Sequence, residues 1–120
     1  MPTPPVVHGA DELLKELETL EVKGRQWLPL VTGVPRKESV SLVERESYFH
    51  HSKLLNLSAH YGKTWDLTLQ NRVKVVYHEL DRGVFALRKG RIDDAKTHIE
   101  TALEDTKSLI MFLKSQSTKS

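Results

Sequence analysis

The apolar residues in the second half of the chain recur at steps of three and four, and this spacing restricts the fold more than any other feature. They form two stripes: Leu69, Val73, Val76, Leu80, Val84 and Leu87, followed by Ile92, Ala95, Ile99, Ala102, Thr106, Leu109 and Leu113. Such steps place side chains on one face of an α-helix, which is stable when that face is buried. The sequence therefore predicts two amphipathic helices, with Gly90 in the turn between them.

Two further segments in the first half have the same period. In the first, the helical pattern starts from Ala10, Asp11 is the expected N-cap, and the buried face carries Leu13, Leu14, Leu17 and Leu20. The second is expected to begin between Pro35 and Ser39 and to end at Gly62, with Val43, either Phe49 or His50, Leu54, Leu57 and Tyr61 on its stripe. Thr64 is the expected N-cap of the third helix.

The chain is expected to form one domain. No run of alternating apolar and polar residues predicts a strand, and the connections are short, so we predict an all-α fold, an antiparallel four-helix bundle. Residues 1–9 contain three prolines and should form an extended arm. Residues 10–114 should form the bundle, and residues 115–120 a frayed tail.

Several function classes are disfavoured by what the sequence lacks. It has no cysteine, which excludes a thiolate nucleophile and cysteine-ligated zinc. It has no GxSxG, Walker or GxGxxG motif, so we expect neither an enzyme nor a cofactor. No apolar run approaches the roughly 20 residues that span a bilayer, and the first residues do not resemble a signal peptide. We therefore expect a soluble intracellular protein, cytoplasmic or nuclear, without a membrane partner.

Histidines and carboxylates on facing helices of a bundle can bind metal, and Glu46, His50, His78 and His98 are the residues to consider. The Glu-x-x-His pair that carboxylate-bridged di-iron bundles use twice is not repeated here. We therefore assign no metal ligands and interpret the histidines as surface or boundary residues.

Residues 79–107 resemble one tetratricopeptide repeat. The resemblance lies in the spacing of small and apolar residues, Gly83, Gly90, Ala95, Ile99 and Ala102. It departs from the family pattern at Glu79, Arg82 and Lys107, where the family has an aromatic residue, a leucine and a proline. It implies a helix-turn-helix unit whose small residues allow close packing. Because about three repeats are needed for a solenoid and no second copy occurs, the peptide-binding groove of that family is not implied.

The first functional hypothesis is a non-catalytic protein–protein interaction module, an adaptor or a subunit of an assembly. Pro29 should kink or end the first helix, and residues 27–35 are expected to form an apolar connector that either folds over the bundle or offers a partner surface. The candidate partner-binding residues are Trp27, Leu28, Leu30, Val31 and Trp65. Wide apolar stripes on four short helices also allow a homodimer.

The alternative hypothesis is a nucleic-acid-binding protein. Six cations in or next to the third helix could contact phosphates as a basic ridge: Arg72, Lys74, Arg82, Arg88, Lys89 and Arg91. Interleaved acidic residues, Asp81, Asp93, Asp94 and Glu100, partly neutralise them, which is typical of a solvated helix face. The net charge of only +2 does not decide between the two hypotheses.

Overall fold

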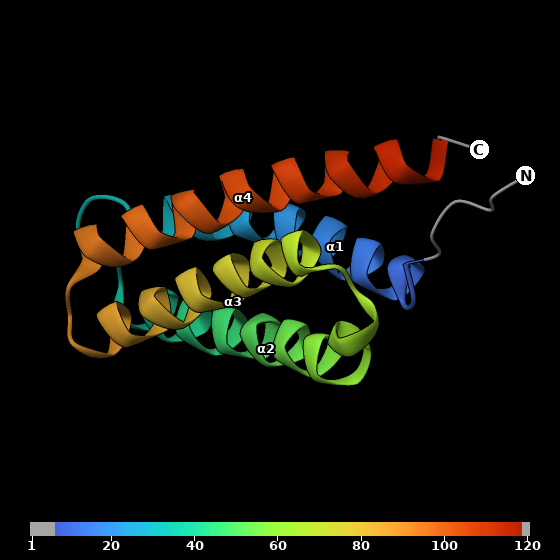
Figure 1. Ribbon diagram of the computed structural model, residues 1–120. Helices are drawn as coiled ribbons and strands as arrows, with labels where there is room; N and C mark the ends of the chain where they lie inside the picture. The colour runs from blue at the N-terminus through green and yellow to red at the C-terminus, as the bar shows by residue number, and fades with distance from the viewer. Residues whose placement is uncertain (1–6, 119–120) are drawn as a thin grey trace, which may run out of the picture.

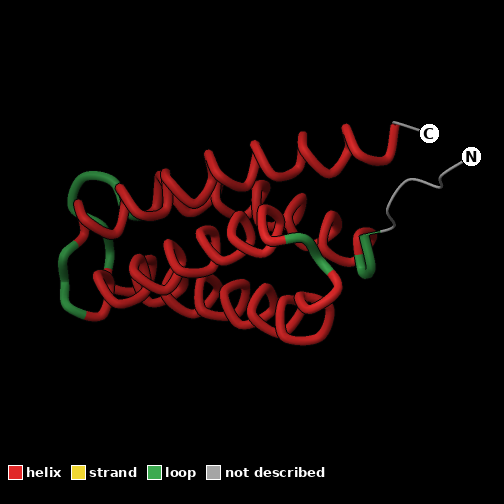
Figure 2. Tube along the Cα trace, viewed as in Figure 1, coloured by secondary structure: helices red, strands yellow, loops and turns green. Residues whose placement is uncertain are grey.

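The fold is built from four long helices in a computed structural model that describes residues 7–118. The helices are α1 (Ala10–Leu30), α2 (Lys37–Tyr61), α3 (Leu67–Arg88) and α4 (Ile92–Thr118), and a 3₁₀ turn, η1 (Gly62–Thr64), lies between α2 and α3. They run up and down, each packs against the next in sequence, and α4 packs back along α1 to close the ring (Figure 1). The described residues contain helices and short loops and no strand (Figure 2). The predicted all-α antiparallel four-helix bundle is thus confirmed.

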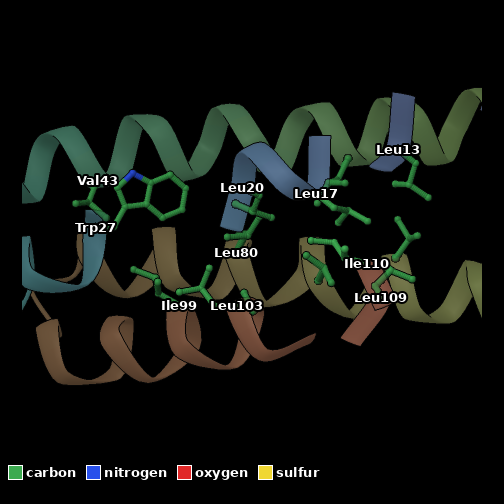
Figure 3. Packing of buried hydrophobic residues seen from close by; sticks show 14 of the residues in the cluster. Leu13, Leu17, Leu20, Trp27, Val43, Leu80, Ile99, Leu103, Leu109 and Ile110 are labelled. Carbon is green, nitrogen blue, oxygen red and sulfur yellow. The ribbon is translucent and has the colours of Figure 1, made fainter. Parts of the chain in front are cut away.

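The core consists of one stripe from each helix. Leu13, Leu17, Leu20 and Trp27 of α1 lie among side chains of the other three helices, including Leu80 of α3 and Ile99 of α4 (Figure 3). All six predicted stripe residues of α3 are buried, and so are those of α4 apart from Ile92, which is partly buried. On α2 the sequence left Phe49 and His50 as alternatives, and the structure buries His50 and exposes Phe49.

Two predicted N-caps are wrong. The N-cap of α1 is Gly9, with φ of 74°, and Asp11 lies inside the first turn. The N-cap of α3 is Asp66, whose carboxylate accepts a hydrogen bond of 2.8 Å from the backbone N–H of Leu69. Thr64 instead lies in η1, where its hydroxyl donates to the carbonyl of Tyr61. Asp and Thr both suit a cap, so composition alone does not determine which one takes the position.

The predicted apolar connector is wrong over its first residues, because α1 continues through Pro29 to Leu30. A proline one residue before the end of a helix removes only one hydrogen bond from its last turn. Trp27 and Val31, each 1% exposed, pack this turn into the core. The predicted frayed tail is also wrong up to residue 118, because α4 extends to Thr118. Of the predicted arm, residues 1–6 lie outside the described residues.

The α3–α4 hairpin has its small residues at the contact between the two helices. A Cβ atom added at Gly83 would lie 3.5 Å from the side chain of Ile99, and Gly90 turns the chain with φ of 74°. The 3.5 Å contact at Gly83 is an ordinary van der Waals distance, so the packing there does not require a glycine. The tetratricopeptide resemblance itself stays a prediction.

Candidate functional site

A cleft of about 930 Å³ opens between α1 and α2 and is the candidate site. Its lining is Glu12, Lys15, Glu16, Thr19 and Lys23 on α1 and Leu42, Arg45, Glu46, Phe49, His50, Lys53, Asn56, Leu57, His60 and Tyr61 on α2. We refer to it as the α1/α2 groove. Leu42 and Phe49 are 38% and 56% exposed, so the groove presents apolar surface to solvent. At about 1.5 Å per residue, its α2 wall from Leu42 to Tyr61 is about 28 Å long.

The floor of the groove contains a buried polar pair. Nδ1 of His50 donates to Oε1 of Glu16 at 2.5 Å, and the two side chains are 6% and 5% exposed. Nζ of Lys53 lies 3.5 Å from the other oxygen of Glu16. Burying a carboxylate is costly unless it is paired, and here Glu16 is paired through both oxygens. The pair joins α1 to α2 across the groove.

A second carboxylate, Glu46, joins the same two helices. Its Oε1 accepts a hydrogen bond of 2.9 Å from the indole nitrogen of Trp27, and its Oε2 accepts one of 3.2 Å from Nζ of Lys23. The Trp27 hydrogen bond is the largest influence on the pKa of Glu46, and together with Lys23 it lowers that pKa against the opposing effect of burial. Glu46 is therefore ionised near neutral pH.

The third carboxylate of the groove, Glu12, lies at its end near the N-terminus of α1. The Tyr61 hydroxyl donates to Oε1 of Glu12 at 2.8 Å, and this hydrogen bond raises the pKa of Tyr61. Gly9 packs against the Tyr61 ring, where an added Cβ would overlap the ring atoms. All three carboxylates of the groove thus accept hydrogen bonds from side chains of the chain itself.

The groove has four Lys and Arg side chains, and two of them form no ion pair with a carboxylate among the described residues. Within residues 7–118, neither Lys15 on α1 nor Arg45 on α2 has a carboxylate within ion-pair distance. The Arg45 side chain donates only a long hydrogen bond of 3.4 Å to the backbone carbonyl of Ser41. The groove therefore combines exposed apolar area with two cations that have no carboxylate partner among the described residues.

The residues predicted to bind a partner are not gathered into one surface. Trp27 and Val31 are buried at one end of the core, and Leu28 and Leu30 are partly buried. Trp65 is 4% exposed, and its indole nitrogen donates to the carbonyl of His8 at 2.8 Å, next to the start of α1. In this conformation the two tryptophans stabilise opposite ends of the bundle, and only Trp27 contributes to the groove, through its hydrogen bond to Glu46.

The six predicted phosphate-binding residues lie on different sides of the α3–α4 hairpin. Arg72 stacks over the ring of Phe112 on α4, whereas Arg88 pairs with Glu44 on α2 at 3.3 Å. Lys89 lies over the Phe85 ring, and Lys74 is exposed. Three of the six, Arg82, Arg88 and Arg91, line a small hollow of about 270 Å³ together with Asp81 and Asp94.

The histidines considered for metal binding are also separated. His50 lies in the groove, His98 donates from Nδ1 to Glu79 at 2.8 Å on the α3–α4 side, and His78 is exposed. Within the part of the chain that the structure describes, no group of three or more His, Asp or Glu side chains could hold a metal ion. In that same part, no helix is long and apolar enough to cross a membrane.

Sequence reasoning missed the groove as a unit, and in particular Lys15, Glu16, Arg45, Phe49 and Lys53. One signal was available: Glu16 lies next to Leu17 and three residues after Leu13, so its side chain falls at the border of the apolar stripe. A carboxylate at that position suggests a buried partner but does not identify His50, which is 34 residues away.

The comparisons with known proteins do not extend this description. No protein-family model matches the chain, and neither a curated protein nor a solved structure matches it. The class that the fold defines is a four-helix bundle with an open groove between its first two helices.

Proposed function

We propose that this chain is a non-catalytic protein–protein interaction module that binds an amphipathic helix of another protein in the α1/α2 groove. The observation that carries the proposal is the exposed apolar area of Leu42 and Phe49 inside an elongated cleft between two helices. Proteins recognise helices in such grooves by burying anchors spaced at i, i+3, i+4 and i+7.

The spacing of residues along α2 suits a helical partner. Leu42 and Phe49 are seven residues apart, and Lys53 follows one turn later, so they form a strip that runs parallel to the helix axis. A groove about 28 Å long matches about five turns of a partner helix. Occupation of this groove would add a fifth helix beside α1 and α2 and would cover the apolar area that Leu42 and Phe49 of α2 leave exposed.

The polar groups of the groove support a binding role more than a catalytic one. Glu16, Glu46 and Glu12 each accept hydrogen bonds from neighbouring side chains, and these contacts fix the relative positions of α1 and α2. A rigid groove binds with a smaller loss of conformational entropy than one that must be ordered first.

A titration with a neutral helical peptide tests the proposal. The probe is an 18-residue peptide with leucine at i, i+3, i+4 and i+7 and with glutamine and alanine elsewhere, added to ¹⁵N-labelled protein. We expect amide shifts confined to the groove walls of α1 and α2, and binding at least tenfold weaker in the Leu42→Ser/Phe49→Ser variant. Met111→Ser on α4, which removes a side chain that is 72% exposed, serves as control and should bind like the wild type. Shifts that ignore the groove, or equal binding by both variants, would overturn the proposal.

Phosphate binding remains a second candidate because Arg82, Arg88 and Arg91 line one hollow beside the exposed ring of Phe85. Titration with short RNA and DNA duplexes at low and moderate salt tests it. Binding that weakens steeply with salt and is lost in Arg88→Glu/Lys89→Glu/Arg91→Glu would support this candidate. Absence of binding at low salt would remove it.

A further inference from the structure

We propose that the helix bound by the α1/α2 groove is acidic, with carboxylates flanking its apolar face where they meet Lys15 and Arg45. This inference rests on the proposed function and adds the chemical nature of the partner. Its basis is the unequal state of the charged side chains in the groove.

Two of the three acidic side chains of the groove, Glu16 and Glu46, pair with lysines, and the third, Glu12, accepts a hydrogen bond from a neutral hydroxyl. Glu16 accepts from His50 and lies 3.5 Å from Lys53, Glu46 accepts from Trp27 and Lys23, and Glu12 accepts from Tyr61. Glu16 is also buried, which limits its access to a partner. Among the described residues, a basic helix would therefore find one exposed carboxylate without a cation partner, Glu12, whereas an acidic helix would find two cations without a carboxylate partner.

The cations have remaining capacity. Lys15 and Arg45 have no carboxylate partner within the described residues, and they lie on opposite walls of the groove. Lys53 and Lys23 each approach only one carboxylate, and an ammonium group has three N–H donors. Lys53 also lies over the Phe49 ring at 5.5 Å, so a positive charge stands beside the exposed apolar anchor.

An acidic amphipathic helix would cover the exposed apolar side chains and would also supply carboxylates for the unpaired cations. Its apolar face would cover Leu42 and Phe49, and carboxylates on its two flanks would pair with Arg45 on one wall and Lys15 on the other. Each exposed pair should change affinity by only about two- to fivefold, because water screens such charges. Charge therefore selects between partners and speeds their association, while the apolar anchors supply most of the affinity.

The test compares two charged forms of the neutral peptide, one with glutamate and one with lysine at the positions flanking the leucines. At low salt we expect the glutamate peptide to bind the groove at least tenfold more tightly than the lysine peptide. The variant Lys15→Glu/Arg45→Glu should reverse that preference. Lys74→Glu, a single charge reversal at an exposed residue of α3, should keep it. Higher salt should reduce the difference between the peptides.

The outcomes separate this inference from the proposed function. Equal binding of both charged peptides in the groove, or a preference for lysine, overturns the acidic partner and leaves the groove as a helix-binding site. A groove that binds none of the three peptides overturns both.

Light scattering of the protein alone checks for occupation by a second copy, and a dimer that dissociates in Leu42→Ser/Phe49→Ser would assign the groove to self-association and overturn the inference. Circular dichroism of each variant confirms that it is folded.

Discussion

At the scale of single residues, the contact between Glu16 and His50 dominates the groove because both side chains are buried and each is the other's nearest polar partner. Replacing one of the two residues leaves the polar group of the other buried without its partner. Removal from both sides leaves only apolar surface to repack. The same logic applies with less force to Glu46, which is partly exposed and has two donors.

We predict that His50→Ala lowers the free energy of unfolding by about 3 kcal/mol, since the buried Glu16 carboxylate then loses its hydrogen bond from His50 and keeps Lys53 at 3.5 Å. The double variant Glu16→Leu/His50→Leu should lose clearly less free energy of unfolding than the sum of the losses in Glu16→Leu and His50→Leu. Urea unfolding followed by circular dichroism measures both. Additive losses would show that the pair does not act as a unit.

The pH dependence of stability provides a prediction for Glu46. Its pKa is lowered in the folded protein, chiefly by the Trp27 indole, so its favourable contribution is present above the unfolded pKa and is lost as pH falls through the lower folded value. The stability difference between wild type and Glu46→Gln should therefore shrink as pH falls from about 5 to about 3. Asp105 affects the pH dependence of stability in the opposite direction, because burial and then the nearby Glu79 and Glu104 raise its pKa. This effect is the same in wild type and in Glu46→Gln, so it cancels in the difference between them. A difference that stays constant or grows toward acid would contradict the assignment.

At the scale of the helices, the apolar period predicted which face of each helix is buried, and it did so because burial imposes that period directly. The ends of the helices were predicted less well. The period does not distinguish Thr64 from Asp66 as a cap, nor does it show that Trp27 and Val31 pack the turn containing Pro29. Close approach of helices is likewise invisible in the sequence, where Gly24 and Gly83 look alike but have different surroundings.

We therefore predict opposite effects for one substitution made in two helices. At Gly24 an added Cβ would overlap the side chain of Leu103, whereas at Gly83 it would meet Ile99 at an ordinary 3.5 Å. Alanine also favours a helix over glycine by up to about 1 kcal/mol. Gly83→Ala should raise the melting temperature, and Gly24→Ala should lower it because α1 and α4 must separate or Leu103 must move. Differential scanning calorimetry measures both melting temperatures. An increase in both variants would show that α1 and α4 do not pack closely at Gly24.

At the scale of the whole molecule, all four neighbouring helix pairs are in contact, and a groove is open along the surface between α1 and α2. The sequence predicted four packed helices but could not predict this opening, because periodicity identifies a buried face without fixing the distance between two helices. It also could not show which charges are paired: Lys15 and Lys53 look equivalent in sequence, yet only Lys53 approaches a carboxylate. The proposed partner helix follows from that three-dimensional difference.

The most direct test of the central claim is photo-crosslinking in the native cell from a benzophenone amino acid placed at position 49, compared with the same group at the exposed position 111 on α4. The account predicts one dominant adduct from position 49, absent from position 111, whose crosslinked peptide is an acidic amphipathic helix of another protein. Adducts that are the same from both positions, or a position-49 adduct that maps to a segment without helical apolar spacing, would contradict it.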